Sequence, residues 1–188
     1  MVDRSITLFA DYVCPFSYMT VLGLDVLAAE LAADVQRRAF ELSPAPMPTA
    51  AAAIAQQWQA VQELAGQAGL RFARPDVVPR TRKAHEAFKY AATIGRHLAL
   101  ERAIFDAYFL RGEDIGRIDV LVRIGAEIGM DATALKIALD LDVHTADVAQ
   151  DRAIAEDLDI MGTPALLAGG EVHVGYLSKK QLREWLGE

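Results

Sequence analysis

The chain has 188 residues, of which 53% are hydrophobic, and its 26 Asp and Glu outweigh 19 Lys and Arg to give a formal net charge of −7. A chain of this size and composition can bury a large core, whereas its negative charge disfavours binding to nucleic acid or to an anionic membrane surface. No stretch nears the roughly 20 apolar residues of a membrane span, and the N-terminal apolar run lacks a small-residue cleavage signal, so we expect a soluble, cytoplasmic protein.

The chain contains one cysteine, Cys14, and four scattered histidines. A single cysteine excludes a disulfide within the chain and disfavours a structural zinc site. We therefore expect no metal ion and no tightly bound cofactor.

The N-terminal part of the chain follows a strand, helix, strand pattern. Residues 5–10 (SITLFA) form a short apolar run, helical spacing extends from Phe16 to about Ala33, and residues 35–42 read as a second strand. Strands joined by a crossover helix are normally parallel, so we expect residues 6–10 and 35–42 to lie side by side. The stretch SPAPMP that follows has three prolines in five residues, which predicts the end of this regular pattern.

From there to about residue 158 the periodicity predicts helices only. Apolar residues recur every three or four positions from Ile54 to Ala68, from Ala87 to Leu98 and from Leu121 to Ile128. The first of these helices is expected to end near Gly69, and Asp131 stands where an N-cap would open a further helix. These segments predict a helical bundle inserted into the chain.

The β character returns in TPALLAGGEVHVGY, near the C-terminus. Two apolar runs flank Gly169 and Gly170, and paired glycines predict a two-residue hairpin turn between antiparallel strands. Ser178 and Gln181 then form a capping-box pattern that predicts a terminal helix. The segments outside the bundle therefore read as βαβ followed by ββα.

This order is that of the thioredoxin fold, and with a helical insertion the chain resembles the DsbA-like family. The resemblance rests on DYVCPFSY, FELSP, RKAHE, GEDIGRIDVL and MGTPALL, which occur in this order. It implies an α/β fold with a thioredoxin-like domain at residues 1–45 and 155–188 and an all-helical inserted domain at residues 46–154.

Within this family the active site most often reads Cys-Pro-aromatic-Cys, and the FrnE-like oxidoreductases belong here. This chain has Cys14, Pro15, Phe16 and Ser17 at that place. A neighbouring branch looks like SPYS or SPFS and holds the glutathione-dependent 2-hydroxychromene-2-carboxylate isomerases and the kappa-class glutathione transferases. The chain combines the cysteine of one branch with the Ser-Tyr sequence of the other.

Cys14 lies at the predicted first turn of a helix, where unpaired N–H groups and the helix dipole favour a thiolate. We therefore predict that its pKa falls below the free value of about 8.5. Pro15 fits the first helical turn because its missing N–H costs no hydrogen bond there. The alternative is that Cys14 is an inert, buried small hydrophobe. Ser17 is either a plain helix-start residue or a hydroxyl donor to the Cys14 thiolate.

The resemblance implies further site residues. Pro164 matches the cis-proline that packs against the active cysteine, and the backbone of Thr163 would bind an extended peptide or glutathione. Without the resemblance, Pro164 reads only as the start of an edge strand. We also predict that Pro15, Phe16 and His85 contribute to substrate binding, although a lone histidine on a helix is more often a packing or surface residue.

Two functions are consistent with these residues. The first is a thiol-disulfide oxidoreductase in which Cys14 is the single nucleophile, acting on a protein or small-molecule disulfide with glutathione as the exchange thiol. The second is a glutathione-dependent isomerase or transferase, in which Cys14 holds or activates the glutathione thiol. A binding module without catalysis is the remaining alternative, and the resemblance allows a homodimer.

Overall fold

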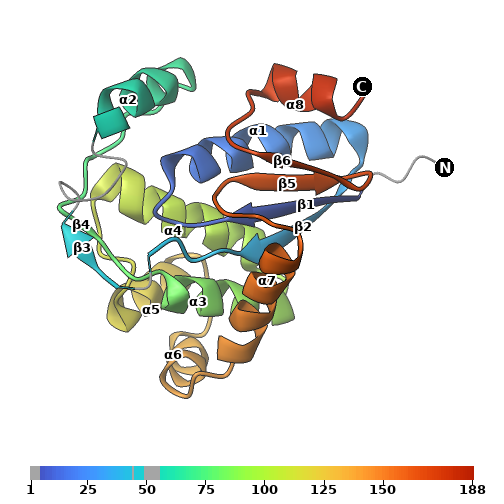
Figure 1. The fold of residues 1–188 in the computed structure, drawn as a ribbon. Helices are drawn as coiled ribbons and strands as arrows, with labels where there is room; N and C mark the ends of the chain where they lie inside the picture. The colour runs from blue at the N-terminus through green and yellow to red at the C-terminus, as the bar shows by residue number, and fades with distance from the viewer. Residues whose placement is uncertain (1–4, 44, 49–55) are drawn as a thin grey trace. The chain divides into compact units, whose positions relative to one another are not determined.

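The computed structural model describes residues 5–43, 45–48 and 56–188, and the chain divides into two compact units (Figure 1). Unit 1 comprises Met1–Leu42 with Asp151–Glu188, and unit 2 comprises Ser43–Gln150. The boundaries predicted from the sequence lie after residues 45 and 154. None of the helices in the described ranges is both long enough and apolar enough to span a bilayer.

Unit 1 is built on a four-stranded mixed sheet with the order β2-β1-β5-β6. Its strands are β1 (Ser5–Ala10), β2 (Asp34–Ala39), β5 (Ala165–Ala168) and β6 (Glu171–Val174). β1 runs parallel to β2, with Ile6 opposite Val35, and antiparallel to β5. The predicted parallel pairing is therefore confirmed, although β2 ends at Ala39 rather than Leu42.

A tight turn joins β5 and β6, which pair antiparallel with Leu166 opposite His173. Gly169 and Gly170 have φ angles of +57° and +83°, a left-handed conformation that glycine adopts without a Cβ clash. Two successive residues with positive φ are characteristic of the type I′ turn that matches the twist of a hairpin. The predicted hairpin is confirmed.

Helices cover both faces of this sheet. Figure 1 shows α1 (Pro15–Leu31) and α8 (Lys179–Trp185) on one side and the C-terminal half of α7 (Thr145–Asp157) on the other. On the α7 side, a buried apolar cluster packs between helix and sheet. It consists of Phe9, Phe40, Ala155, Ile160 and Ala165. Ser178 caps α8 through the predicted capping box with Gln181.

The buried carboxylate of Asp151, on α7, binds the C-terminal end of β2. Asp151, only 2% exposed, accepts hydrogen bonds from the Arg38 side chain at 2.9 Å and from the Ala39 N–H at 2.8 Å. Arg152 lies 4.4 Å above the ring of Phe40, a cation–π contact. These contacts anchor the chain where it leaves β2, beside the end of β1 that leads to Cys14.

Unit 2 is predominantly helical. It contains α2 (Trp58–Gln67), α3 (Arg82–Thr93), α4 (His97–Arg111), α5 (Ile118–Glu127), α6 (Ala132–Asp140) and the start of α7. Stacked rings of Phe72 and Phe109, 4.8 Å apart, form part of its core. Asp131 caps α6 by accepting the Thr133 and Ala134 N–H groups, as predicted. Ile54, at the expected start of α2, lies outside the described residues.

The prediction that the insertion is all-helical is wrong in one place. β3 (Met47–Pro48) pairs antiparallel with β4 (Val77–Val78), so a short two-stranded sheet lies in unit 2. The prolines of SPAPMP were predicted to end the regular pattern of strands and helices. Proline lacks only the N–H donor, however, and it is tolerated in an edge position such as this one.

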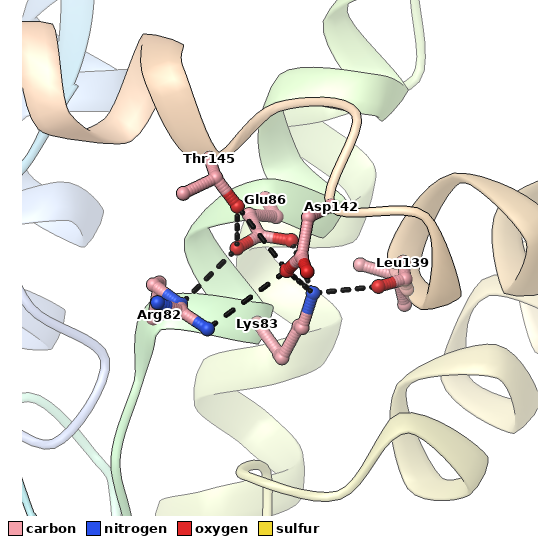
Figure 2. A network of polar contacts seen from close by, with 6 residues as sticks. All are labelled: Arg82, Lys83, Glu86, Leu139, Asp142 and Thr145. Atoms are coloured by element: carbon pink, nitrogen blue, oxygen red, sulfur yellow. Dashed lines mark hydrogen bonds and ion pairs between the residues drawn. The ribbon is translucent and has the colours of Figure 1, made fainter.

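A buried ionic cluster joins α3 to the corner between α6 and α7 (Figure 2). Glu86 on α3 is 1% exposed and is contacted by Lys83 at 2.6 Å, Arg82 at 3.3 Å and the Thr145 hydroxyl at 2.8 Å. The Lys83 ammonium also donates to the Leu139 carbonyl and to the Asp142 carboxylate, both at 2.6 Å. Partners from α3 and from the start of α7 therefore surround the buried carboxylate of Glu86.

Candidate functional site

The candidate site in unit 1 begins at the end of β1, where the chain turns into α1. Cys14 is the N-cap residue of α1 and has an extended backbone, with φ −92° and ψ 111°. Its N–H donates to the Asp11 carbonyl at 3.0 Å, which closes the turn. Pro15 occupies the first helical turn, as predicted.

Cys14 meets a segment that is distant in the sequence. Its Sγ donates a 3.4 Å hydrogen bond to the carbonyl oxygen of Thr163. The Thr163–Pro164 peptide bond is cis, as the resemblance implied. The Gly175 N–H donates to the Pro164 carbonyl at 2.8 Å, which links this loop to the end of β6. The fold thus brings Cys14, Thr163 and Pro164 together.

The predicted lowering of the Cys14 pKa is wrong. Cys14 is 5% exposed, and burial raises the pKa of its thiol above the usual value. The side chains of Ser17 and Thr163 and the Ser17 N–H oppose this shift, because hydrogen bonds to sulfur favour the thiolate, and the negative charge of Asp11 adds to it. The prediction rested on the helix N-terminus alone, whereas the largest effect is the loss of hydration around the buried sulfur.

The hydroxyl groups of Ser17 and Thr163 both favour the thiolate form of Cys14. Ser17 is fully buried, and its Oγ accepts the Asp11 N–H at 3.4 Å, which leaves its own proton available to the sulfur. Thr163 Oγ1 is buried and makes no well-aligned hydrogen bond to any residue in the described ranges. Because both hydroxyls lower the pKa of Cys14, the donor interpretation of Ser17 is favoured over that of a plain helix-start residue.

An aromatic pair lies beside the cysteine. The rings of Phe16 and Tyr176 are 6.4 Å apart, and both side chains are partly exposed. Met161, two residues before Thr163, is 81% exposed. Burial raises the pKa of Tyr176, so its phenol is neutral at physiological pH. Tyr176 was not identified from the sequence, because its proximity to Phe16 depends on the hairpin fold.

His85 belongs to unit 2, where it is 4% exposed in the first turn of α3. It is therefore a buried residue of the helical unit, and its predicted contribution to substrate binding stays a prediction. Asp11 was missed entirely by the sequence analysis. It is fully buried, and its Oδ2 accepts the Leu42 N–H at 2.7 Å. Across the described ranges, no group of three or more His, Cys, Asp or Glu side chains is arranged to hold a metal ion.

Comparison with known proteins identifies the family to which the chain belongs. The family model of the DsbA-like thioredoxin domain matches residues 5–187. The chain belongs to the DsbA-like thioredoxin family. The chain is also similar to the uncharacterized protein YwbO of Bacillus subtilis (strain 168), with 28% identity over 184 residues covering 93% of this chain and 91% of that protein.

Solved structures show the same DsbA-like fold. A probable DsbA oxidoreductase from Streptomyces coelicolor superposes with a TM-score of 0.86 at 20% identity, over 97% of this chain and 88% of that one. A 2-hydroxychromene-2-carboxylate isomerase follows with a TM-score of 0.81 at 17% identity, over 97% and 93%. The cytosolic disulfide reductase DsbM from Pseudomonas aeruginosa, solved with GSH, has a TM-score of 0.73 at 20% identity, over 98% and 93%. At these identities the likeness establishes the fold alone.

Proposed function

We propose that the protein is a thiol-disulfide oxidoreductase that works through Cys14 alone and uses glutathione as its exchange thiol. The observation that carries the proposal is the position of the Cys14 sulfur, which lies at the N-terminus of α1 and faces the Thr163 carbonyl, with a serine at the place of the second cysteine. Glutathione is suggested by the single thiol and by the solved complex of DsbM with GSH.

The first step is attack of the Cys14 thiolate on one sulfur of a substrate disulfide. A bond forms between Cys14 Sγ and that sulfur, while the other substrate sulfur leaves as a thiolate and takes up a proton. Ser17 and Thr163 stabilise the attacking thiolate by hydrogen bonds from their hydroxyl groups. The product is a mixed disulfide at Cys14.

The second step requires an outside thiol, because the hydroxyl of Ser17 cannot attack a disulfide. A glutathione thiolate attacks the mixed disulfide, which frees Cys14 and leaves the substrate sulfur bonded to glutathione. A second glutathione releases the substrate thiol and becomes oxidised glutathione. In sum, one disulfide and two glutathiones give two thiols and one oxidised glutathione.

The raised pKa of Cys14 favours the reductive direction. A thiol of high pKa holds its disulfide more strongly than a thiol of low pKa, which makes Cys14 more reducing, and it also leaves more slowly when glutathione attacks in the second step. Strong oxidants of this fold depend on the opposite condition, a stabilised thiolate. We therefore propose a disulfide reductase rather than an oxidase, in the cytoplasm where reduced glutathione is abundant.

The test is reduction of a small disulfide with and without added glutathione. The unmutated protein should turn over only with glutathione, and Cys14→Ser should be inactive. Ser17→Cys supplies a second thiol and should form an internal disulfide, so it should complete one round of exchange without glutathione. Efficient reduction by the unmutated protein without added thiol would show that the single-thiol mechanism is wrong.

A glutathione-dependent isomerase or transferase is the second candidate. It is supported by Ser17 followed by Tyr18, the sequence of the isomerase branch, and by the TM-score of 0.81 with 2-hydroxychromene-2-carboxylate isomerase. In this function Cys14 would hold the glutathione thiol by a hydrogen bond and form no covalent adduct. Full glutathione-dependent isomerisation by Cys14→Ser would place this candidate first.

A further inference from the structure

Residues 71–80, which lie between α2 and α3 in unit 2 and include β4, differ in charge from the rest of the chain. They contain three arginines and one aspartate, a formal charge of +2, which leaves −9 for the other residues of a chain whose net charge is −7. All four of these charged side chains, Arg71, Arg74, Asp76 and Arg80, are exposed. Residues 71–80 therefore form a cationic strip on an acidic protein.

Arg71 and Arg74 lack the acidic partners that many other arginines of the protein have. Arg111, for example, forms an ion pair with Glu113. The side chains of Arg71 and Arg74 make neither a hydrogen bond nor an ion pair with any other residue in the ranges 5–43, 45–48 and 56–188. Their positive charges are therefore available to an external partner.

The backbone around the two arginines is held by the core of unit 2. The ring of Phe72 is 3% exposed and stacks on Phe109, whose carbonyl accepts the Ala73 N–H at 2.7 Å. The Gln62 side chain donates to the Phe72 carbonyl at 2.5 Å. Because Phe72 and Pro75 are buried, the exposed arginines beside them stand on a fixed backbone, and a partner need not order it on binding.

We propose that the cationic strip binds an acidic segment of another protein, with Arg71 and Arg74 contacting two carboxylates and Val77 contacting an apolar side chain. A guanidinium group matches a carboxylate in geometry as well as in charge. Val77, on β4, is 44% exposed and offers an apolar contact to the same partner. This inference goes beyond the proposed function and does not depend on Cys14.

The two arginines at the N-terminal end of the strip carry this inference. Asp76 lies within the strip, and the Asp114 carboxylate approaches the Arg80 carbonyl, since a Cβ on Gly116 would lie 3.1 Å from each. These two acids lower the positive charge toward the C-terminal end of the strip. The attraction for an anion is therefore strongest at the N-terminal end.

The spacing of the two arginines favours an acidic peptide over other anions. Residues three positions apart lie up to about 10 Å from each other in an extended chain, which suits carboxylates a few residues apart on one polypeptide. A single inorganic anion would contact both guanidinium groups only if these like charges approached each other. A nucleic acid would extend beyond the strip, where the charge of the rest of the chain repels it.

The test uses a short fluorescein-labelled peptide of glutamates around one leucine, and fluorescence anisotropy measures its binding. The unmutated protein should bind the peptide, and the affinity should fall as the salt concentration rises. The joint change Arg71→Gln and Arg74→Gln should weaken binding about tenfold, because two charged contacts are lost. Both side chains are exposed, so the double variant should unfold like the unmutated protein.

Arg96→Gln is the matched control. It removes an exposed arginine at the N-cap of α4, whose side chain likewise has no ion pair with a described residue, and it should bind the peptide as the unmutated protein does. Val77→Ser should weaken binding of this peptide but not of an all-glutamate peptide. Cys14→Ser should bind normally, so failure of the proposed function would leave this result intact.

Three outcomes would overturn the inference. The first is no binding by the unmutated protein at low salt, and the second is equal affinity in the double variant and in Arg96→Gln. The third is displacement of the labelled peptide by inorganic phosphate, or by a thymidine oligonucleotide of equal charge, at least as effectively as by the unlabelled peptide. That result would indicate a site for small anions or for nucleic acid instead.

Discussion

Two buried polar groups, one in each unit, are surrounded by different partners. The Glu86 carboxylate of unit 2 meets two cations and a hydroxyl, which neutralise its charge (Figure 2). The Cys14 thiol of unit 1 donates a hydrogen bond to the neutral carbonyl of Thr163. The negative charge of Asp11 adds to the rise in its pKa. The first group is held as an ion and the second is held as an uncharged thiol.

Because their partners differ, the Glu86 carboxylate matters for the stability of the fold, whereas the surroundings of Cys14 matter for its reactivity. A buried ion with its partners in place is costly to disrupt, because removal of one partner leaves the others uncompensated. A buried thiol without a cation costs little to keep protonated, and its chemistry is limited by the cost of ionisation. We therefore expect changes at Glu86 to affect folding and changes around Cys14 to affect its rate of reaction.

The largest expected effect is at Glu86. Glu86→Ala should lower the free energy of unfolding by roughly 3 kcal/mol, because it removes the buried carboxylate that pairs with the partly buried cations of Lys83 and Arg82. The control is Lys136→Ala, which breaks an exposed ion pair with Asp140 and should cost less than about 1 kcal/mol. Urea unfolding followed by circular dichroism measures both. Equal losses in the two variants would show that the cluster is not an anchor of unit 2.

The next effect is on reactivity. Thr163→Val keeps the shape of the side chain and removes the hydroxyl that favours the Cys14 thiolate, so alkylation at neutral pH should slow about tenfold. Thr93→Val, which removes an exposed hydroxyl on α3, is the control and should leave the rate unchanged. A Thr163→Val rate equal to that of the unmutated protein would remove Thr163 from the set of thiolate donors.

A smaller effect is the dependence of stability on alkaline pH. The folded-state pKa of Cys14 is raised, so its contribution to stability is fully present below the unfolded value of about 8.5 and is lost as the pH rises through the folded value. The unmutated protein should therefore lose stability relative to Cys14→Ser between neutral pH and about pH 10. Thermal unfolding of both proteins across this range measures it, and parallel curves would contradict the raised pKa.

The smallest effect is at acid pH, at the exposed edge of the Glu86 cluster. The hydrogen bond from Lys83 lowers the pKa of Asp142, so the stability that Asp142 provides is present above the unfolded value of about 3.9 and is lost as the pH falls through the folded value. Asp142→Asn should flatten this part of the acid unfolding curve only slightly, since the carboxylate is exposed. A change as large as that of Glu86→Ala would mean that the cluster depends on Asp142 instead.

The parts of the fold that were predicted from the sequence are those encoded by local patterns. Paired glycines at the hairpin, the serine and glutamine of the capping box and the N-cap Asp131 each act within a few residues. The cis bond at Pro164 and its place beside Cys14 came from the family resemblance, because local sequence cannot specify a cis bond. The short β3–β4 pairing was missed because it joins two brief segments far apart in the chain.

The electrostatics of the site was not predicted either, because it depends on contacts between residues that are far apart in the sequence. The helix N-terminus at Cys14 is a local feature that favours a thiolate, whereas burial of the sulfur and the field of Asp11 depend on the packed fold. The cluster at Glu86 likewise joins residues 59 positions apart in sequence. Neither long-range effect leaves a periodic or spaced pattern in the sequence.

The most direct test of the single-thiol mechanism is the intact mass of the protein after incubation with oxidised glutathione. The unmutated protein should gain one glutathione at Cys14, keep it after excess reagent is removed, and lose it when reduced glutathione is added. Cys14→Ser should gain none. If the unmutated protein gains no glutathione at a pH where Cys14 is alkylated, or releases it without added thiol, Cys14 does not exchange disulfides in the way proposed.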